Sequence, residues 1–162
     1  MDQNCLIAEY TNERDFQIAI EVLEKAHYTQ DEVSIVKHAD DSRLAEIEEA
    51  EDKTPTSMSG EKAAAAGTIA GGTLGAALGT MTLIGPLLVA GPLLGMAAGA
   101  VGGGLVGTVK SWGVDDEVAA SYEAKVRDGA MLLIVTTNDL RLKGAEQILK
   151  TTGPDSLEMY DR

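Results

Sequence analysis

The residues whose types and spacing could bind a cofactor lie in one glycine-rich run. The run Gly102–Gly107, GGGLVG, matches the G-x-G-x-x-G pattern that holds a dinucleotide pyrophosphate. That pattern functions between a buried strand and the start of a helix, whereas here it lies near the end of a long uncharged run. Lys110 follows Gly107 by three residues, which also departs from the spacing of a phosphate-binding loop. We therefore expect no nucleotide and no other cofactor.

Few side chains could hold a metal or act as nucleophiles. His27 and His38 are the only histidines and Cys5 is the only cysteine, and no two of them have the i,i+4 or C-x-x-C spacing of zinc ligands. The acidic stretch 41–62 lacks the D-x-[DN]-x-[DN]-G spacing of a calcium loop. No Ser/His/Asp arrangement follows from the spacing. The sequence therefore predicts a protein that is not an enzyme and has no metal site.

Charge divides the chain into three blocks. Residues 1–62 carry sixteen acids and six bases, residues 110–162 carry ten and seven, and residues 63–109 carry none of either sign. With a net charge of −13, the protein is not expected to bind nucleic acid, because phosphate contacts need clustered Lys and Arg. The first ten residues lack the basic and apolar regions of a signal peptide, so we expect a protein that is not secreted.

The uncharged block, residues 63–109, contains thirteen of the eighteen glycines. Two series recur at every fourth position, which places glycine along one face of a helix and lets a second backbone approach closely. The Gly-Pro pairs at 85–86 and 91–92 are strong helix breakers. We expect two helices, at about 64–84 and 92–109, folded into a glycine-zipper hairpin. The expected helix-packing and oligomerisation residues are Gly67, Gly71, Gly75, Gly79, Gly91, Gly95, Gly99, Gly103 and Gly107.

The residues on either side of the block alternate between strand and helix patterns. CLIAEY indicates a strand, residues 11–28 a helix that starts at Thr11, and TQDEVSIVKHAD a turn and a second strand. After Gly113 come a helix closed by Gly129, a strand AMLLIVTTN, a helix with apolar positions Leu140, Ala145, Ile148 and Leu149, and a final strand SLEMYDR. This order predicts an α+β, ferredoxin-like βαβ–βαβ sheet with its helices on one face and the hairpin inserted between the second and third strands. The expected parts are a first half (1–40), an acidic linker (41–62), the hairpin (63–110) and a second half (111–162).

Two stretches resemble the bacterial general-stress (heat-induced stress protein) domain. In the first, Ala19, Leu23, Tyr28, Asp31 and the run Val33–Val36 fit the family pattern of a helix, a turn and a second strand. In the second, Gly113, Val114, Ala119, Tyr122, Val126 and Gly129 fit a pattern that precedes a strand. The resemblance implies a stress-linked protein, often described as a membrane protein, and brings no known active site.

Three surroundings suit an uncharged hairpin. In a lipid bilayer, Lys62, Lys110 and Trp112 would mark the cytoplasmic boundary of the inner membrane, as the positive-inside rule expects. Between copies of the chain, the hairpins would pack into a cytoplasmic oligomer, filament or shell. The hairpin could also lie flat on its own sheet. We expect a non-enzymatic, stress-associated protein that anchors to a membrane and self-associates. The alternatives are a soluble self-assembling protein and, on fold analogy, a small-molecule sensor.

Overall fold

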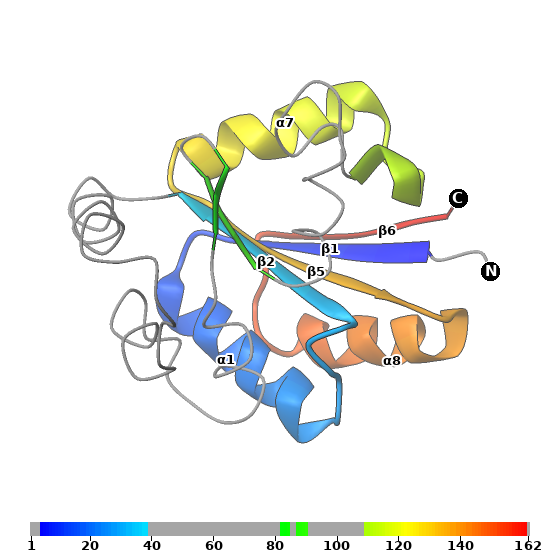
Figure 1. Cartoon of the computed structure of the whole chain (residues 1–162). Helices are drawn as coiled ribbons and strands as arrows, with labels where there is room; N and C mark the ends of the chain where they lie inside the picture. The colour runs from blue at the N-terminus through cyan, green and yellow to red at the C-terminus, as the bar shows by residue number, and fades with distance from the viewer. Residues whose placement is uncertain (1–3, 39–81, 85–86, 91–108, 162) are drawn as a thin grey trace, which may run out of the picture.

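The computed structural model describes residues 4–38, 82–84, 87–90 and 109–161 as an α+β fold in three layers. An antiparallel sheet forms the middle layer (Figure 1). The helices α1 (Glu13–Lys25) and α8 (Asp139–Lys150) cover one face, and α7 (Asp116–Arg127) covers the other. The expected linker, 41–62, lies outside the described residues.

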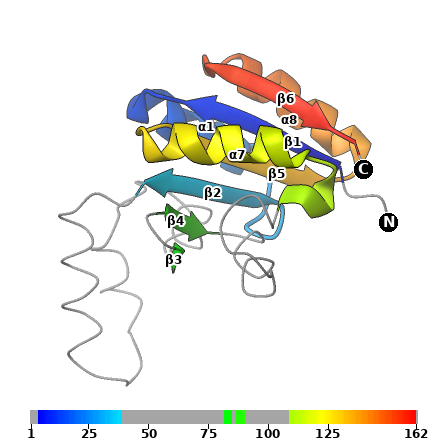
Figure 2. The ribbon, with the colours of Figure 1, turned by 90° about the horizontal axis from the view of Figure 1, so that it is seen from above.

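The sheet has the strand order β3-β4-β2-β5-β1-β6. Its four longer strands are β1 (Asn4–Tyr10), β2 (Val33–His38), β5 (Met131–Thr137) and β6 (Ser156–Tyr160). Strand β5 pairs with both β1 and β2, and β6 pairs with the other side of β1. The short strands β3 (Thr82–Ile84) and β4 (Leu87–Ala90) continue the sheet beyond β2, at the end opposite β6 (Figure 2).

The strand side chains alternate between two hydrophobic cores. In β1, Leu6, Ala8 and Tyr10 face α1 and α8, whereas Cys5 and Ile7 face α7. Because β5 alternates in the same way, the two central strands are buried on both faces, and this explains their nearly continuous apolar runs. Each helix covers its core with a stripe at helical spacing: Phe16, Ala19, Ile20 and Leu23 in α1; Leu142, Ala145 and Leu149 in α8; Ala119, Tyr122 and Val126 in α7.

Local sequence signals set the ends of these helices. The Asn12 side chain caps α1 by accepting hydrogen bonds from the backbone of Arg14 and Asp15, and Asn138 caps α8 in the same way. Gly129, with φ of 107°, ends α7 in the left-handed conformation. The predicted end of α7 at Gly129 is therefore confirmed, whereas α1 begins after Asn12 and not at Thr11.

The helices α1 and α8 share one face of the sheet, and α7, the helix that follows the apolar block, packs on the opposite face. The structure corrects two expectations. Leu140, expected in the apolar face of its helix, is 82% exposed, since the inward stripe starts at Leu142. The predicted helix 64–84 is wrong at its last three residues, which form β3. Thr82 and Ile84 are β-branched, and strands favour such residues.

The rest of the predicted hairpin, 64–81 and 92–108, lies outside the described residues. Among those that are described, no helix combines the length and the apolar character that a membrane crossing requires.

Candidate functional site

The structure describes two of the residues predicted from sequence to act in packing or at a membrane, Lys110 and Trp112. All nine zipper glycines and Lys62 lie outside the described residues, so their roles stay predictions. The candidate site is therefore the place where the apolar block, residues 63–109, joins the folded domain.

The first join is the pairing of β4 with β2. Residues Leu87 to Ala90 lie antiparallel to His38 through Ile35, and this register places Val89 opposite Val36. Val36 also lies opposite Leu132 of β5. Val89 is 3% exposed, and Val36 and Leu132 are fully buried in the core beneath α7. A valine from the middle of the apolar block is thus part of the domain's second core.

The second join is at the end of the apolar block, at its last residue, Val109, and at Trp112 just after it. Val109 and Trp112 are 1% and 3% exposed and pack in that same core. A 3-10 turn, Lys110–Trp112, carries the tryptophan inward, and Gly113 ends it with φ of 84°. The buried Cys5 thiol donates a hydrogen bond to the Trp112 carbonyl oxygen at 3.9 Å. We call Val36, Val89, Val109 and Trp112 the attachment cluster.

Lys110 and Trp112 have different environments. The Lys110 ammonium forms a 2.8 Å ion pair with Asp116 in the first turn of α7, and both side chains are more than half exposed. Trp112 is buried between the sheet and α7. Their assignment to a membrane boundary stays a prediction. Within the domain, Lys110 faces water and Trp112 fixes the end of the apolar block.

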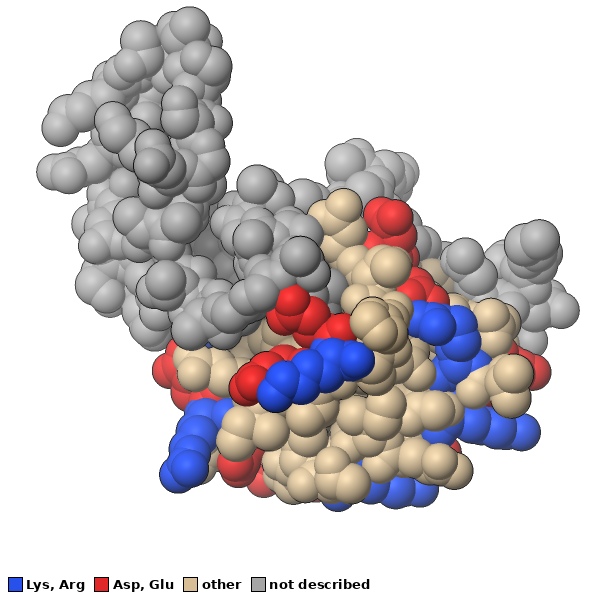
Figure 3. Space-filling model, turned by 90° about the horizontal axis from the view of Figure 1, so that it is seen from below, with Lys and Arg blue, Asp and Glu red and all other residues tan. Residues whose placement is uncertain are grey.

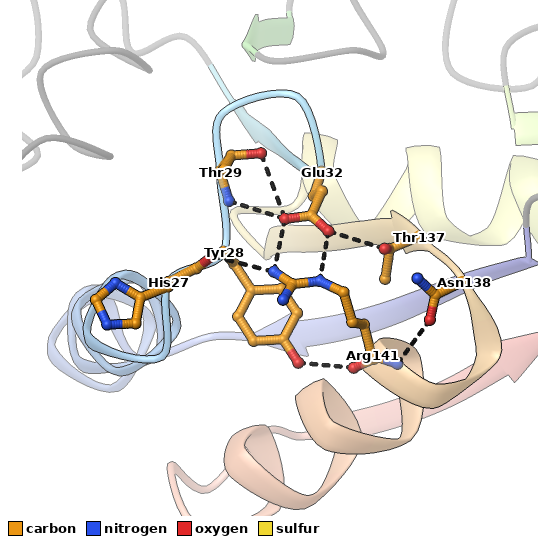
Figure 4. Close-up of polar contacts among 7 residues, drawn as sticks. All are labelled: His27, Tyr28, Thr29, Glu32, Thr137, Asn138 and Arg141. Carbon is orange, nitrogen blue, oxygen red and sulfur yellow. Dashed lines mark hydrogen bonds and ion pairs between the residues drawn. The ribbon is translucent and has the colours of Figure 1, made fainter.

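A polar cluster lies on the α1–α8 side of the sheet (Figure 4). The Arg141 guanidinium donates from Nε and from a terminal nitrogen to the two Glu32 carboxylate oxygens, at 2.7 and 2.8 Å. Glu32 also accepts from the Thr29 backbone at 3.1 Å and from the Thr137 hydroxyl at 2.8 Å. Burial by itself raises the pKa of Glu32, but these hydrogen bonds outweigh it and lower the pKa to about 2.

Tyr28 completes this cluster. Its ring lies 4.5 Å from the Arg141 guanidinium carbon, and its hydroxyl donates to the Arg141 carbonyl oxygen at 2.6 Å. Arg141 further donates to the His27 carbonyl oxygen at 3.0 Å. The cluster joins the turn after α1, the end of β5 and the start of α8. Since Glu32 and Arg141 neutralise each other, we assign the cluster a positioning role and no chemistry.

A second polar cluster lies under α7. Glu9, with its side chain 9% exposed, accepts a 2.7 Å hydrogen bond from Lys125 and a 3.0 Å bond from the Ser156 hydroxyl. The Tyr122 and Tyr160 hydroxyls lie 3.2 Å apart, and Tyr160 donates to Glu158.

The pKa shifts in this second cluster keep Lys125, Tyr122 and Tyr160 protonated at neutral pH. Bonding to Glu9 raises the pKa of Lys125, and burial raises those of Tyr122 and Tyr160. Burial also raises the pKa of the nearby Cys5 thiol to about 12, so this cysteine stays protonated and is a poor nucleophile at neutral pH. In the part of the chain that is described, no three His, Cys, Asp or Glu side chains are grouped to hold a metal ion.

Sequence reasoning missed both polar clusters and the β4–β2 pairing. Glu32 and Arg141 are 109 positions apart, and no local pattern links them. The pairing of β4 had one available signal: β-branched and apolar residues on both sides of Gly85-Pro86, a pattern typical of two short strands.

The surface of the domain has no broad area of one charge on the face seen in Figure 3, where acidic and basic side chains are interspersed among neutral ones. That face gives no electrostatic indication of a nucleic acid or a highly charged partner.

Comparison with known proteins places the chain in a family. Residues 63–158 match the family described as Protein of unknown function (DUF1269). No curated protein and no solved structure matches significantly. The family match leaves out the first stretch that resembles the general-stress domain and includes the second. Because the match covers more than half of the chain, the protein belongs to the DUF1269 family.

Proposed function

We propose that this protein is a non-enzymatic assembly protein that self-associates through its apolar, glycine-rich block. The observation that carries the proposal is the attachment cluster, in which a 47-residue stretch without charge, 63–109, is held at Val89 and Val109 by one core. In this view the folded domain is a scaffold, and the glycine face supplies close packing between copies. The resemblance to the general-stress domain suggests that this assembly serves a stress response.

The domain would be ferredoxin-like, with the apolar block as an insertion. The order β2-β5-β1-β6 of the four longer strands supports this classification, because the strands of the two βαβ halves, β1 with β2 and β5 with β6, interleave in one antiparallel sheet. The insertion would begin after β2 and end before α7. Relative to a four-stranded ferredoxin-like domain, this chain adds β3 and β4 to the sheet and α7 to the second face of the sheet.

Chain length favours association with other copies over a bilayer. Residues 91–108 connect Ala90 of β4 to Val109, and both are part of the folded domain. As a helix, these 18 residues would extend about 27 Å at 1.5 Å per residue. That is about one crossing of a hydrocarbon core roughly 30 Å thick, and returning to Val109 would need a second crossing. Membrane insertion would therefore require β4 to leave β2.

Membrane anchoring remains the second candidate, favoured by Lys62 and Lys110 on either side of the uncharged block. The two candidates differ in what the protein does without detergent. A self-assembling protein is recovered as a soluble oligomer, whereas a membrane-anchored one sediments with membranes and floats with lipid vesicles.

The deciding experiment is fractionation of cells that express the full chain, followed by light scattering of the detergent-free soluble fraction. We expect a soluble oligomer. The variant Gly75→Leu with Gly99→Leu should dissociate it, because leucine fills the groove that the glycines leave. The matched control, Ala77→Leu with Ala97→Leu, adds the same side chain away from the glycine face and should remain assembled. A wild-type monomer in plain buffer would overturn the proposal, and recovery only with membranes would favour the second candidate.

A further inference from the structure

We propose that copies of this protein associate by exchanging β3 and β4, so that β4 of one copy pairs with β2 of another. The inference rests on the proposed function, since it names the surface through which self-association occurs. The interaction surface is the edge of β2 from Ile35 to His38, and the occupant is residues 87–90 of a second copy.

The first observation is that β3 and β4 form a small unit joined to the domain by one strand. β3 pairs only with β4, and β4 pairs with β2 over four residues, in the described sheet. Val89 of β4 is buried in the core beneath α7. A unit that pairs with the rest of the sheet over four residues at its edge opens at a free energy below that of global unfolding.

The second observation is the length of chain on either side of this unit. Residues 39–81 separate β2 from β3, and residues 91–108 separate β4 from Val109, which gives connections of 43 and 18 residues. Fully extended, 18 residues can span roughly 60 Å, which is ample to reach a neighbouring domain. The chain can therefore transfer β3 and β4 without disturbing the other strands.

The third observation is that exchange keeps the pairing of β4 with β2 and the burial of Val89. Val36 lies between Val89 on one side and Leu132 on the other, and all three are buried in the core under α7. A Val89 supplied by a second copy fills the same space as the chain's own. Removing β4 without replacement would expose the β2 edge, and such edges readily accept another strand. Exchange of identical elements is a common route from monomer to dimer.

Paired cysteines test the exchange. In a Cys5→Ala background, a long-tagged Val36→Cys chain and a short-tagged Val89→Cys chain are co-expressed and oxidised with diamide. The two positions are direct partners of an antiparallel pair, a separation that a disulfide can span. We expect a disulfide between the two chains, in up to about half of the molecules if copies pair at random.

One control and one further variant complete the test. Co-expressed Val36→Cys and Leu132→Cys chains should give no interchain disulfide, because β2 and β5 stay in one copy. The double variant Val36→Cys with Val89→Cys should give covalent dimers on a non-reducing gel. If the double variant gives only an internal disulfide, or none, the exchange is overturned.

Light scattering of the same samples separates this proposal from the proposed function. An oligomer without interchain Val36–Val89 disulfides would overturn the exchange and keep self-association through other surfaces. A monomer would overturn both.

Discussion

At the scale of residues, a few polar side chains hold together segments of the domain that are distant in sequence. Glu32 accepts hydrogen bonds from three residues, Thr29, Thr137 and Arg141. Tyr28 covers the Arg141 guanidinium. Charge-assisted bonds of this kind are stronger than neutral ones, so this cluster should contribute measurably to stability.

Replacing Glu32 by Gln should lower the free energy of unfolding at pH 7 by about 2 kcal/mol, because the bidentate pair with Arg141 loses its charge. Chemical denaturation measures this directly. Glu21→Gln is the matched control, since its partner Lys25 is 71% exposed and Glu21 is 55% exposed. Such a surface pair contributes less than about 0.5 kcal/mol. Equal losses in the two variants would contradict the role assigned to Glu32.

The same cluster predicts a pH dependence. The pKa of Glu32 is lowered from 4.5 to about 2 in the folded state, so the unfolded chain binds this proton more tightly. The stability that Glu32 contributes is therefore complete above about pH 4.5 and is lost as pH falls towards about 2. Denaturation from pH 7 to pH 2.5 should show this loss in the wild type and a smaller slope in Glu32→Gln.

His27 has a backbone conformation that suits glycine. Its φ is 62°, in the left-handed region, at the point where the Tyr28 amide bonds back to the Leu23 carbonyl oxygen and ends α1. We expect His27→Gly to raise the free energy of unfolding by about 0.5 kcal/mol, because glycine removes the strain. Ala26→Gly is the control: its φ of −86° is ordinary, and the change should destabilise. Loss of stability in His27→Gly would contradict this account.

At the scale of elements, α8 approaches the turn after α1 through a glycine. A side-chain carbon added at Gly144 would lie 3.0 Å from the Tyr28 hydroxyl oxygen. Tyr28 is held between Arg141 and the core, so it cannot move away easily. The glycine weakens the helix by up to about 1 kcal/mol relative to alanine, and the close approach of the tyrosine explains its presence.

Gly144→Ala should therefore destabilise the protein by about 1 kcal/mol, despite the better helix propensity of alanine. In a Tyr28→Phe background, which removes the hydroxyl, the same change should be neutral or stabilising. A double-mutant cycle by urea denaturation measures the difference. Additive effects would show that the hydroxyl does not set the requirement for glycine.

At the scale of the whole molecule, two cores share one sheet. Strands β1 and β5 place alternate side chains in each core. Separating either layer of helices from the sheet would therefore expose apolar side chains of both strands. The domain should then unfold as one unit. Because Trp112 is the only tryptophan and lies in the α7 core, its fluorescence reports on that layer alone.

We expect the urea transitions measured by Trp112 fluorescence and by circular dichroism at 222 nm to coincide, since the dichroism reports on all helices. Transitions with separate midpoints would mean that the α7 layer unfolds by itself. The Gly75→Leu with Gly99→Leu variant, measured alongside, should show the same coincidence if the apolar block serves association and not domain folding.

The sequence by itself determined the type and order of the longer elements. The runs around Leu6, Val33 and Leu132 and the helical spacing around Phe16 predict strands and helices correctly, because apolar periodicity is a local property of the chain. The breaks in the chain at Gly113 and Gly129 could also be predicted from the sequence. Both glycines have a positive φ, which other residues rarely adopt.

Only the tertiary structure decided which face each helix covers, where β3 and β4 pair, and how Glu32 reaches Arg141. An amphipathic helix such as α7 can pack on either face of a sheet that is apolar on both. By sequence, residues 82–84 fit the end of a helix and residues 87–90 the tip of a hairpin, and only pairing along the edge of β2 makes them strands. These outcomes depend on burial and hydrogen bonding between residues distant in sequence, and no window along the chain contains that information.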